Sequence, residues 1–190
     1  MTRFVDRGAI VAAYVGIGMA VTIGVSFLLV IPIEPIVTWL AVPAGLTIGY
    51  YANQRSNRLT GLRRMVANGV YAGLVTGLAT GLLFLAVKGL FFAADNGYRD
   101  PGLGGQLTCE TGAECVYQRY LEGPQGSELA GVGVTDADSF SSFYWNQQLG
   151  STVTLVLLNT LGGLGGGLIY AASRPKRTAV ATETGSAPAE

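Results

Sequence analysis

The stretch GVYAGLVTGLATGLLFLAV, residues 69–87, decides the fold of this chain. It contains no charged residue, and its glycines Gly69, Gly73, Gly77 and Gly81 recur at intervals of four. Residues four apart lie on one face of an α-helix, so these glycines predict a helix with a groove free of side chains along one side. An apolar helix with such a groove is typical of a membrane span that packs closely against another helix.

Three further stretches of the chain also lack charged side chains. Because about 20 apolar residues cross a bilayer core as a helix, we predict an all-α integral membrane protein. Its membrane domain, residues 1–177, has four transmembrane helices, at residues 8–30, 36–52, 66–87 and 149–173. A signal peptide is the alternative for the first apolar run, but that run exceeds a usual h-region and ends without an A-x-A site, which favours an uncleaved helix.

The charged residues alternate between the two sides of the predicted spans. Nine of the twelve basic residues lie before the first span, between the second and third, or after the fourth. Nine of the twelve acidic residues lie at Glu34 or from Asp95 to Asp138. Since basic flanks stay cytoplasmic, we expect a multi-pass protein with both termini inside and an extracytoplasmic segment at residues 93–148.

The cellular location follows from the same plan. The absence of an endoplasmic-reticulum retention signal and the compact hairpins favour a prokaryotic plasma membrane.

Residues 178–190 are small and polar without apolar periodicity, so we expect a disordered cytoplasmic tail. The basic clusters abut helix ends, where topology explains them, and we expect no nucleic-acid partner. Around residues 55–64, an anionic-lipid site is the alternative to a simple inside anchor.

The two halves of the chain show a weak internal similarity. A shift of 57 positions lays Arg7 on Arg64 and Gly16 on Gly73, and a shift of 119 lays Tyr51-Ala52 on Tyr170-Ala171. This pattern predicts two repeated hairpins in a parallel pseudo-repeat, with the outer segment inserted between helices 3 and 4. Chance matching of common membrane residues is the alternative.

Small residues at four-residue spacing also mark the first and fourth spans. Lipid provides no hydrophobic drive for helices to associate, so side-chain-free grooves favour close van der Waals packing, as in a glycine zipper. The predicted helix-packing residues are Gly16, Gly24, Gly69, Gly73, Gly77, Gly81, Gly163 and Gly167. The pattern leaves open whether these grooves meet helices of the same chain or of another subunit.

The two cysteines, Cys109 and Cys115, both lie in the outer segment. Two cysteines six positions apart on the oxidising side predict one disulfide that closes a small loop. A metal site is the alternative, but the chain has no histidine and no second cysteine pair to complete a tetrahedral ligand set. We therefore expect no metal and no cofactor.

Polar chemistry inside the spans is sparse. No ionisable residue lies in the centre of a span, which argues against a proton-coupled transporter, and Asn159 is a possible intramembrane polar contact. Outside, Glu110 with Glu114 and Asp136 with Asp138 could act as acid–base pairs or bind calcium, although a solvated acidic loop fits better. Without histidine the chain cannot assemble a Ser-His-Asp triad, and we do not expect an enzyme.

Aromatic residues flank the outer ends of the third and fourth spans. They predict an outer aromatic belt, or else an exposed patch for a partner. These residues are Phe91, Phe92, Phe140, Phe143, Tyr144 and Trp145. Between them, Val116–Leu121 is expected to form a helical turn with Tyr117 and Tyr120 on one face.

The sequence leaves two candidate functions. The first is a non-catalytic accessory, scaffold or interaction subunit, whose partners are the lipid bilayer and another membrane protein or a second copy of itself. It would use the glycine-lined helix faces and the acidic, disulfide-closed outer loop. The alternative is a homo-oligomeric channel or passive carrier, with a path lined by glycine, threonine and Asn159.

Overall fold

The structure is a computed structural model of the chain. It describes residues 4–30, 34–56, 61–94, 109, 111–123 and 126–173. The described elements are all helical. In chain order they are α1 (Arg7–Gly24), the π-helical turn η1 (Val25–Val30), α2 (Glu34–Gln54), α3 (Leu62–Ala94), α4 (Ala113–Glu122), α5 (Gly126–Gly131) and α6 (Ala137–Ser173). The predicted tail, residues 178–190, lies outside the described residues.

Three of the described helices are long and apolar enough to cross a membrane. They cover Arg7–Leu29, Leu62–Ala94 and Ala137–Ser173. The remaining long helix, α2, has 21 residues and contains Pro43. Several of its residues are aromatic or polar rather than aliphatic, and it is not among these three, although its length is sufficient for a bilayer core.

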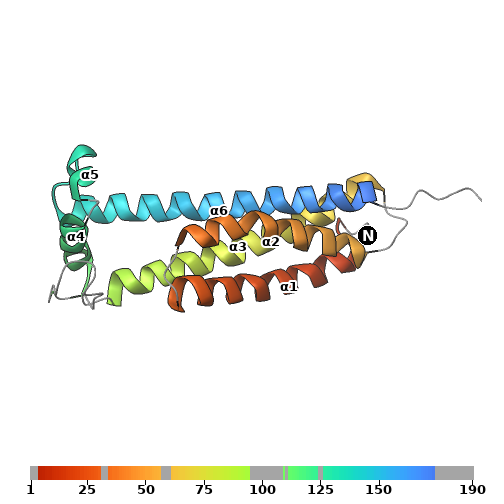
Figure 1. Ribbon diagram of the computed structural model, residues 1–190, viewed down its shortest axis with the longest axis horizontal. Coiled ribbons are helices and arrows are strands. Elements are labelled where there is room, and N and C mark those ends of the chain that lie inside the picture. Colours follow the sequence, from red (N-terminus) through yellow and green to blue (C-terminus); the bar gives the residue numbers. More distant parts are fainter. Residues whose placement is uncertain are drawn as a thin grey trace, which may run out of the picture.

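The four long helices form one elongated bundle of two antiparallel hairpins (Figure 1). With 33 and 37 residues, α3 and α6 are longer than α2, which has 21. At a rise of about 1.5 Å per residue, α6 extends over roughly 55 Å, well beyond a hydrocarbon core of about 30 Å. In Figure 1, α3 and α6 run past the end of the α1–α2 hairpin towards α4 and α5, while the N-terminus lies at the opposite end.

The distribution of side chains in the bundle is the reverse of that in a soluble protein. On α3 the buried face consists largely of Gly, Ala, Thr and Asn, whereas Leu74, Leu78 and Leu82 are exposed. On α6 the buried face includes Gly162, Gly163, Gly166 and Gly167. Its exposed residues include four leucines and an isoleucine, Leu149, Leu157, Leu161, Leu168 and Ile169. Small residues inside and aliphatic residues outside are what a hydrocarbon solvent favours.

The helix packing lacks the two-fold symmetry that the predicted parallel repeat implies. An axis exchanging α1 with α3 and α2 with α6 would give α1 the same contact with α6 that α3 has with α2. In the structure α3 packs against α2, but α1 contacts only α2 and α3 extensively and at most touches α6. The sequence similarity between the halves is therefore not matched by an equivalent arrangement of the helices.

The start of α6 differs from the predicted fourth span. The helix begins at Ala137 rather than near Leu149, so residues that we placed in the outer segment belong to a continuous helix. A capping interaction explains the earlier start. The backbone N–H of Ser139 donates to the Asp136 carboxylate (2.8 Å), and the backbone N–H of Asp136 donates to the Ser139 hydroxyl (3.2 Å). Reciprocal bonds of this kind satisfy the free N–H groups of a first helical turn.

This cap makes the first turn of α6 sensitive to acid. The backbone N–H of Ser139, and then its hydroxyl, donate to the carboxylate and hold the pKa of Asp136 below its ordinary value of 3.8. A lowered folded-state pKa stabilises the turn at pH values above the ordinary pKa, and this stabilisation is lost as the pH falls through the folded-state pKa.

Pepsin cleavage within Ala137–Phe140 should therefore accelerate as the pH falls below about 4. Asp136→Asn keeps a capping acceptor without titrating, so its first turn should lack the acid-dependent step; an identical step in both proteins would contradict the assignment.

Candidate functional site

The centre of the bundle is a point where three helices meet backbone to backbone. A Cβ atom added at Gly73 of α3 would lie 2.5 Å from the backbone oxygen of Asn159 and 2.9 Å from Cα of Gly163, both on α6. Cβ atoms at Gly49 of α2 and at Gly69 of α3 would each meet the backbone oxygen of Gly163. Gly163 thus lies between α2 and α3, and neither Gly163 nor the glycines that face it have room for a side chain.

The remaining predicted packing glycines also face helices of the same chain. Gly77 and Gly81 of α3 lie against Val156 and Thr152 of α6, and Gly167 of α6 lies against Met65 of α3. The two predicted packing glycines of α1 contact side chains instead of backbone. Gly16 lies against Thr76 and Gly24 lies against Leu83, both on α3.

Asn159 is buried at this crossing, with 1% of its surface exposed. Its side-chain Nδ2 donates to the backbone oxygen of Leu155, one turn earlier in α6, at 3.0 Å. Its Oδ1 has no hydrogen-bond partner among the described residues. Exchanging the amide's O and N would place an oxygen against the Leu155 carbonyl oxygen, so one polar atom stays unsatisfied in either orientation.

A polar cluster that the sequence reasoning missed joins three helices at the end near the N-terminus. Its centre is Asn68 of α3, which is 0% exposed. The backbone N–H of Asp6 donates to Asn68 Oδ1 (3.0 Å), and Asn68 Nδ2 donates to Asp6 Oδ2 (3.0 Å) and to the Ser56 hydroxyl (3.2 Å). Asn53 of α2 donates to the backbone oxygen of Met65 at 2.9 Å. An ion pair between Arg64 and Asp6 (3.2 Å) completes the cluster.

This polar cluster fixes how α1 enters the bundle. Asp6 occupies the N-cap position of α1, yet its side chain makes no bond to the first turn of its own helix. It binds Asn68 and Arg64 of α3 instead. Next to it, a Cβ at Gly8 would lie 2.6 Å from the backbone of Arg55 and Ser56, so the start of α1 also touches the end of α2 directly. The sequence did contain a signal for this cluster. Three uncharged polar residues, Asn53, Ser56 and Asn68, lie on the side predicted to be cytoplasmic, and Asp6 is a carboxylate among the basic residues of that side.

A second hydrophobic core lies at the opposite end and forms what we call the outer module: α4, α5 and the adjoining turns of α3 and α6. Its buried residues include Tyr117, Leu129, Phe140 and Tyr144, and Phe92 of α3 packs against them. The ring centroids of Tyr117 and Tyr120 lie 5.4 Å and 5.0 Å from that of Phe140. The helical turn expected at Val116–Leu121 is present within α4, and both of its tyrosines face the same core.

The outer module changes the interpretation of the aromatic residues. Phe140 is 0% exposed and Tyr144 is 4% exposed, so neither belongs to an exposed patch or to a belt facing lipid. The error followed from the predicted helix boundary, because starting α6 at Ala137 places Phe140 and Tyr144 on one helical face towards α4. Phe91 does remain exposed, at 43%.

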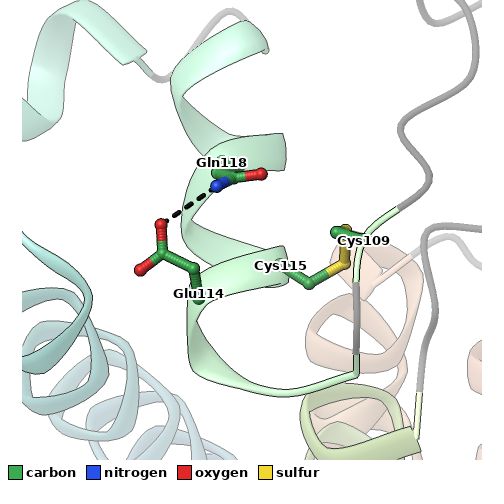
Figure 2. Close-up of a disulfide and its surroundings, with 4 residues drawn as sticks. All are labelled: Cys109, Glu114, Cys115 and Gln118. Carbon is green, nitrogen blue, oxygen red and sulfur yellow. Dashed lines mark hydrogen bonds between the residues drawn. A yellow bond between two sulfur atoms is a disulfide. The ribbon is translucent and has the colours of Figure 1, made fainter.

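The Cys109–Cys115 disulfide is present and attaches the chain before α4 to the start of that helix (Figure 2). Cys115 is fully buried. Glu114 accepts a hydrogen bond from Gln118 one turn further along, at 3.0 Å, whereas Glu110 lies outside the described residues. The described part of the chain contains no group of three or more His, Cys, Asp or Glu side chains suited to a metal ion.

No protein-family model, curated protein or solved structure matches this chain.

The backbone crossing predicts a strong asymmetry between glycines. Gly73→Leu should lower the free energy of unfolding by at least about 3 kcal/mol, above the usual overpacking cost, because its neighbours are backbone atoms that cannot rotate away. Gly18→Leu on α1 is the matched control, since an added Cβ there meets nothing within 4 Å. Thermal unfolding in mild detergent measures both, and equal effects would contradict the packing described.

The two buried asparagines should respond to different extents when they are replaced by leucine. Asn68→Leu leaves the Asp6 N–H and carboxylate and the Ser56 hydroxyl with fewer partners, which should cost about 2–4 kcal/mol of stability. Asn159→Leu removes an unbonded acceptor and one hydrogen bond to a carbonyl of its own helix, and should change stability by no more than about 1 kcal/mol. The same unfolding assay compares them. A larger loss for Asn159→Leu would mean that its Oδ1 has a partner essential to the fold.

Proposed function

We propose that the chain is a four-span protein of the plasma membrane with both ends of the membrane domain cytoplasmic. The length of α2 and its place in the bundle support the fourth span, since it runs antiparallel to α1 and contacts all three other long helices. Its side chains towards the surroundings include Trp39, Val42 and Tyr50. The basic residues at the N-terminal ends of α1 and α3 support the inside assignment of that end, and we keep the prokaryotic origin as part of this proposal.

Within the membrane the protein acts as a non-catalytic scaffold that holds the outer module in a fixed position. The observation that carries this proposal is the continuity of α3 and α6. Each helix passes from the glycine-packed bundle into the aromatic core of the outer module without interruption. Phe92 of α3 lies 4.8 Å from Tyr144 of α6, ring centroid to ring centroid, so the two helices remain joined beyond the bundle.

The contacts of the glycine-lined faces refine this role. All eight predicted packing glycines touch other helices of the same chain, which supports a glycine zipper that closes the bundle rather than one that recruits a partner. We therefore propose that the partner, a second membrane protein or another copy of the chain, binds the outer module and the exposed aliphatic surface.

The same contacts favour the scaffold over a pore. A path lined by Asn159 requires that residue to face a passage, yet it is 1% exposed. The backbone atoms of α2, α3 and α6 meet at its level. A pore between subunits would need lining residues on the outside of the bundle, where the described residues of α3 and α6 are mainly aliphatic.

Purification in a mild detergent, followed by native mass measurement, tests the scaffold proposal. We expect a stoichiometric complex that is lost in Phe140→Ala, because that change removes the fully buried ring at the centre of the outer module. Phe91→Ala, an exposed aromatic residue on the same side, is the matched control and should retain the complex. A pure homo-oligomer that is unaffected by Phe140→Ala and conducts ions would support the pore instead, and a monomer without any partner would contradict both.

A further inference from the structure

The cytoplasmic end of the bundle carries a cluster of arginines, which we call the arginine patch: Arg7, Arg55 and Arg63. The three come from α1, the end of α2 and α3, and all are exposed. The polar cluster brings them together. Asp6, next to Arg7, binds Asn68 and Arg64 of α3, while Gly8 lies against the backbone of Arg55.

The charge at this end is not balanced within the described part of the chain. Asp6 is the carboxylate found there, and both of its oxygens are already used, Oδ1 by Arg64 and Oδ2 by Asn68. Among the described residues, Arg7, Arg55 and Arg63 form no ion pair. The positive-inside rule requires basic residues on this side, but it does not require that they lie at three helix ends that meet beside Asp6, whose carboxylate is already engaged.

The positions of these arginines on their helices add to the positive potential. Arg7 and Arg63 lie in the first turns of α1 and α3, and neither first turn contains an acidic residue. A helix N-terminus carries a partial positive charge and favours anions, so a cation there is unfavourable without an anionic partner. The two helices run in the same direction and pack together, so their N-termini act on the same region.

Arg55 is held in an orientation that leaves its terminal groups available. Its Nε donates to the hydroxyl of Tyr51 at 3.0 Å, and its guanidinium lies 5.4 Å from the centroid of the Tyr51 ring. These contacts occupy Nε and one face of the guanidinium, and the two terminal NH₂ groups can still donate to a phosphate. An arginine oriented in advance loses less conformational freedom on binding than a free one.

We infer that the arginine patch binds the phosphate of an anionic phospholipid in the cytoplasmic leaflet. The inference rests on the proposed membrane placement, which puts these arginines at the headgroup level of that leaflet. Exposed apolar residues of α1, Ile10, Val11 and Tyr14, continue from Arg7 along the helix and would lie along the acyl chains. A phospholipid supplies both the phosphate and the chains that this combination of surfaces fits.

The test is a lipid titration of the purified full chain in non-ionic detergent, followed by native mass spectrometry. Phosphatidylglycerol should bind, and phosphatidylcholine, with no net charge, should bind at least tenfold more weakly. Because each basic residue near an anionic surface contributes about one factor of five in affinity, Arg7→Gln, Arg55→Gln and Arg63→Gln should each weaken phosphatidylglycerol binding by about that factor. Arg119→Gln, which removes a charge from the outer module, is the control and should leave the affinity unchanged.

Three results would overturn the inference. These are equal binding of the two lipids, unchanged affinity in the three patch variants, and competition by inorganic phosphate as effective as by the lipid, which would indicate a site for a free anion. Carbonate extraction of membranes separates this failure from that of the proposed function. A wild-type protein released by carbonate would refute the membrane placement, whereas a retained protein without lipid preference would refute only the lipid site.

Discussion

The structure depends on the contact that Gly163 of α6 makes simultaneously with α2 and α3. Backbone atoms of Gly49, Gly69 and Gly73 approach it so closely that a single Cβ at any of these positions would overlap the neighbouring helix. In a hydrocarbon environment, dispersion contacts between closely approaching helices replace the hydrophobic effect as the source of stability. This crossing makes α6 the common partner of α2 and α3, and many aliphatic side chains of α3 and α6 face outward.

Different interactions hold the two ends of the bundle together. At the end near the N-terminus, the cluster around the fully buried Asn68 attaches α1 to the other helices through polar bonds that are partly shielded from solvent. At the outer end, where α3 and α6 extend beyond the α1–α2 hairpin, aromatic packing around Phe140 and the disulfide hold the outer module. We propose that the glycine crossing between them is a rigid support, and we therefore assign interaction to the outer module and lipid contact to the end near the N-terminus.

Much of this arrangement could be predicted from local sequence patterns, and the failures have specific physical causes. Glycine spacing in residues 69–81 gives the helix face correctly because periodicity is a local property. The bonds between Asp6 and Asn68 join residues 62 positions apart, and the uncharged polar residues near the helix ends indicate a polar contact without showing which residues pair. Hydropathy does not reveal the early start of α6, because Asp136 and Ser139 begin the helix by capping it. That one boundary decided the environment of Phe140 and Tyr144. The sequence similarity of the two halves concerns helix faces, and it does not determine how the helices are arranged.

The central claim is that α2 crosses the membrane as part of a bundle whose polar cluster is cytoplasmic and whose aromatic core is external. Labelling of single cysteines with a membrane-impermeant maleimide in intact cells tests it most directly, because the native cysteines are joined in the disulfide. Pro35→Cys, Gln54→Cys and Ser127→Cys report on the two ends of α2 and on α5, and all three positions are exposed. Labelling of Pro35→Cys and Ser127→Cys in intact cells, with Gln54→Cys labelled only after permeabilisation, is the predicted result. Labelling of Pro35→Cys and Gln54→Cys from the same side would show that α2 does not cross the membrane and would contradict the account.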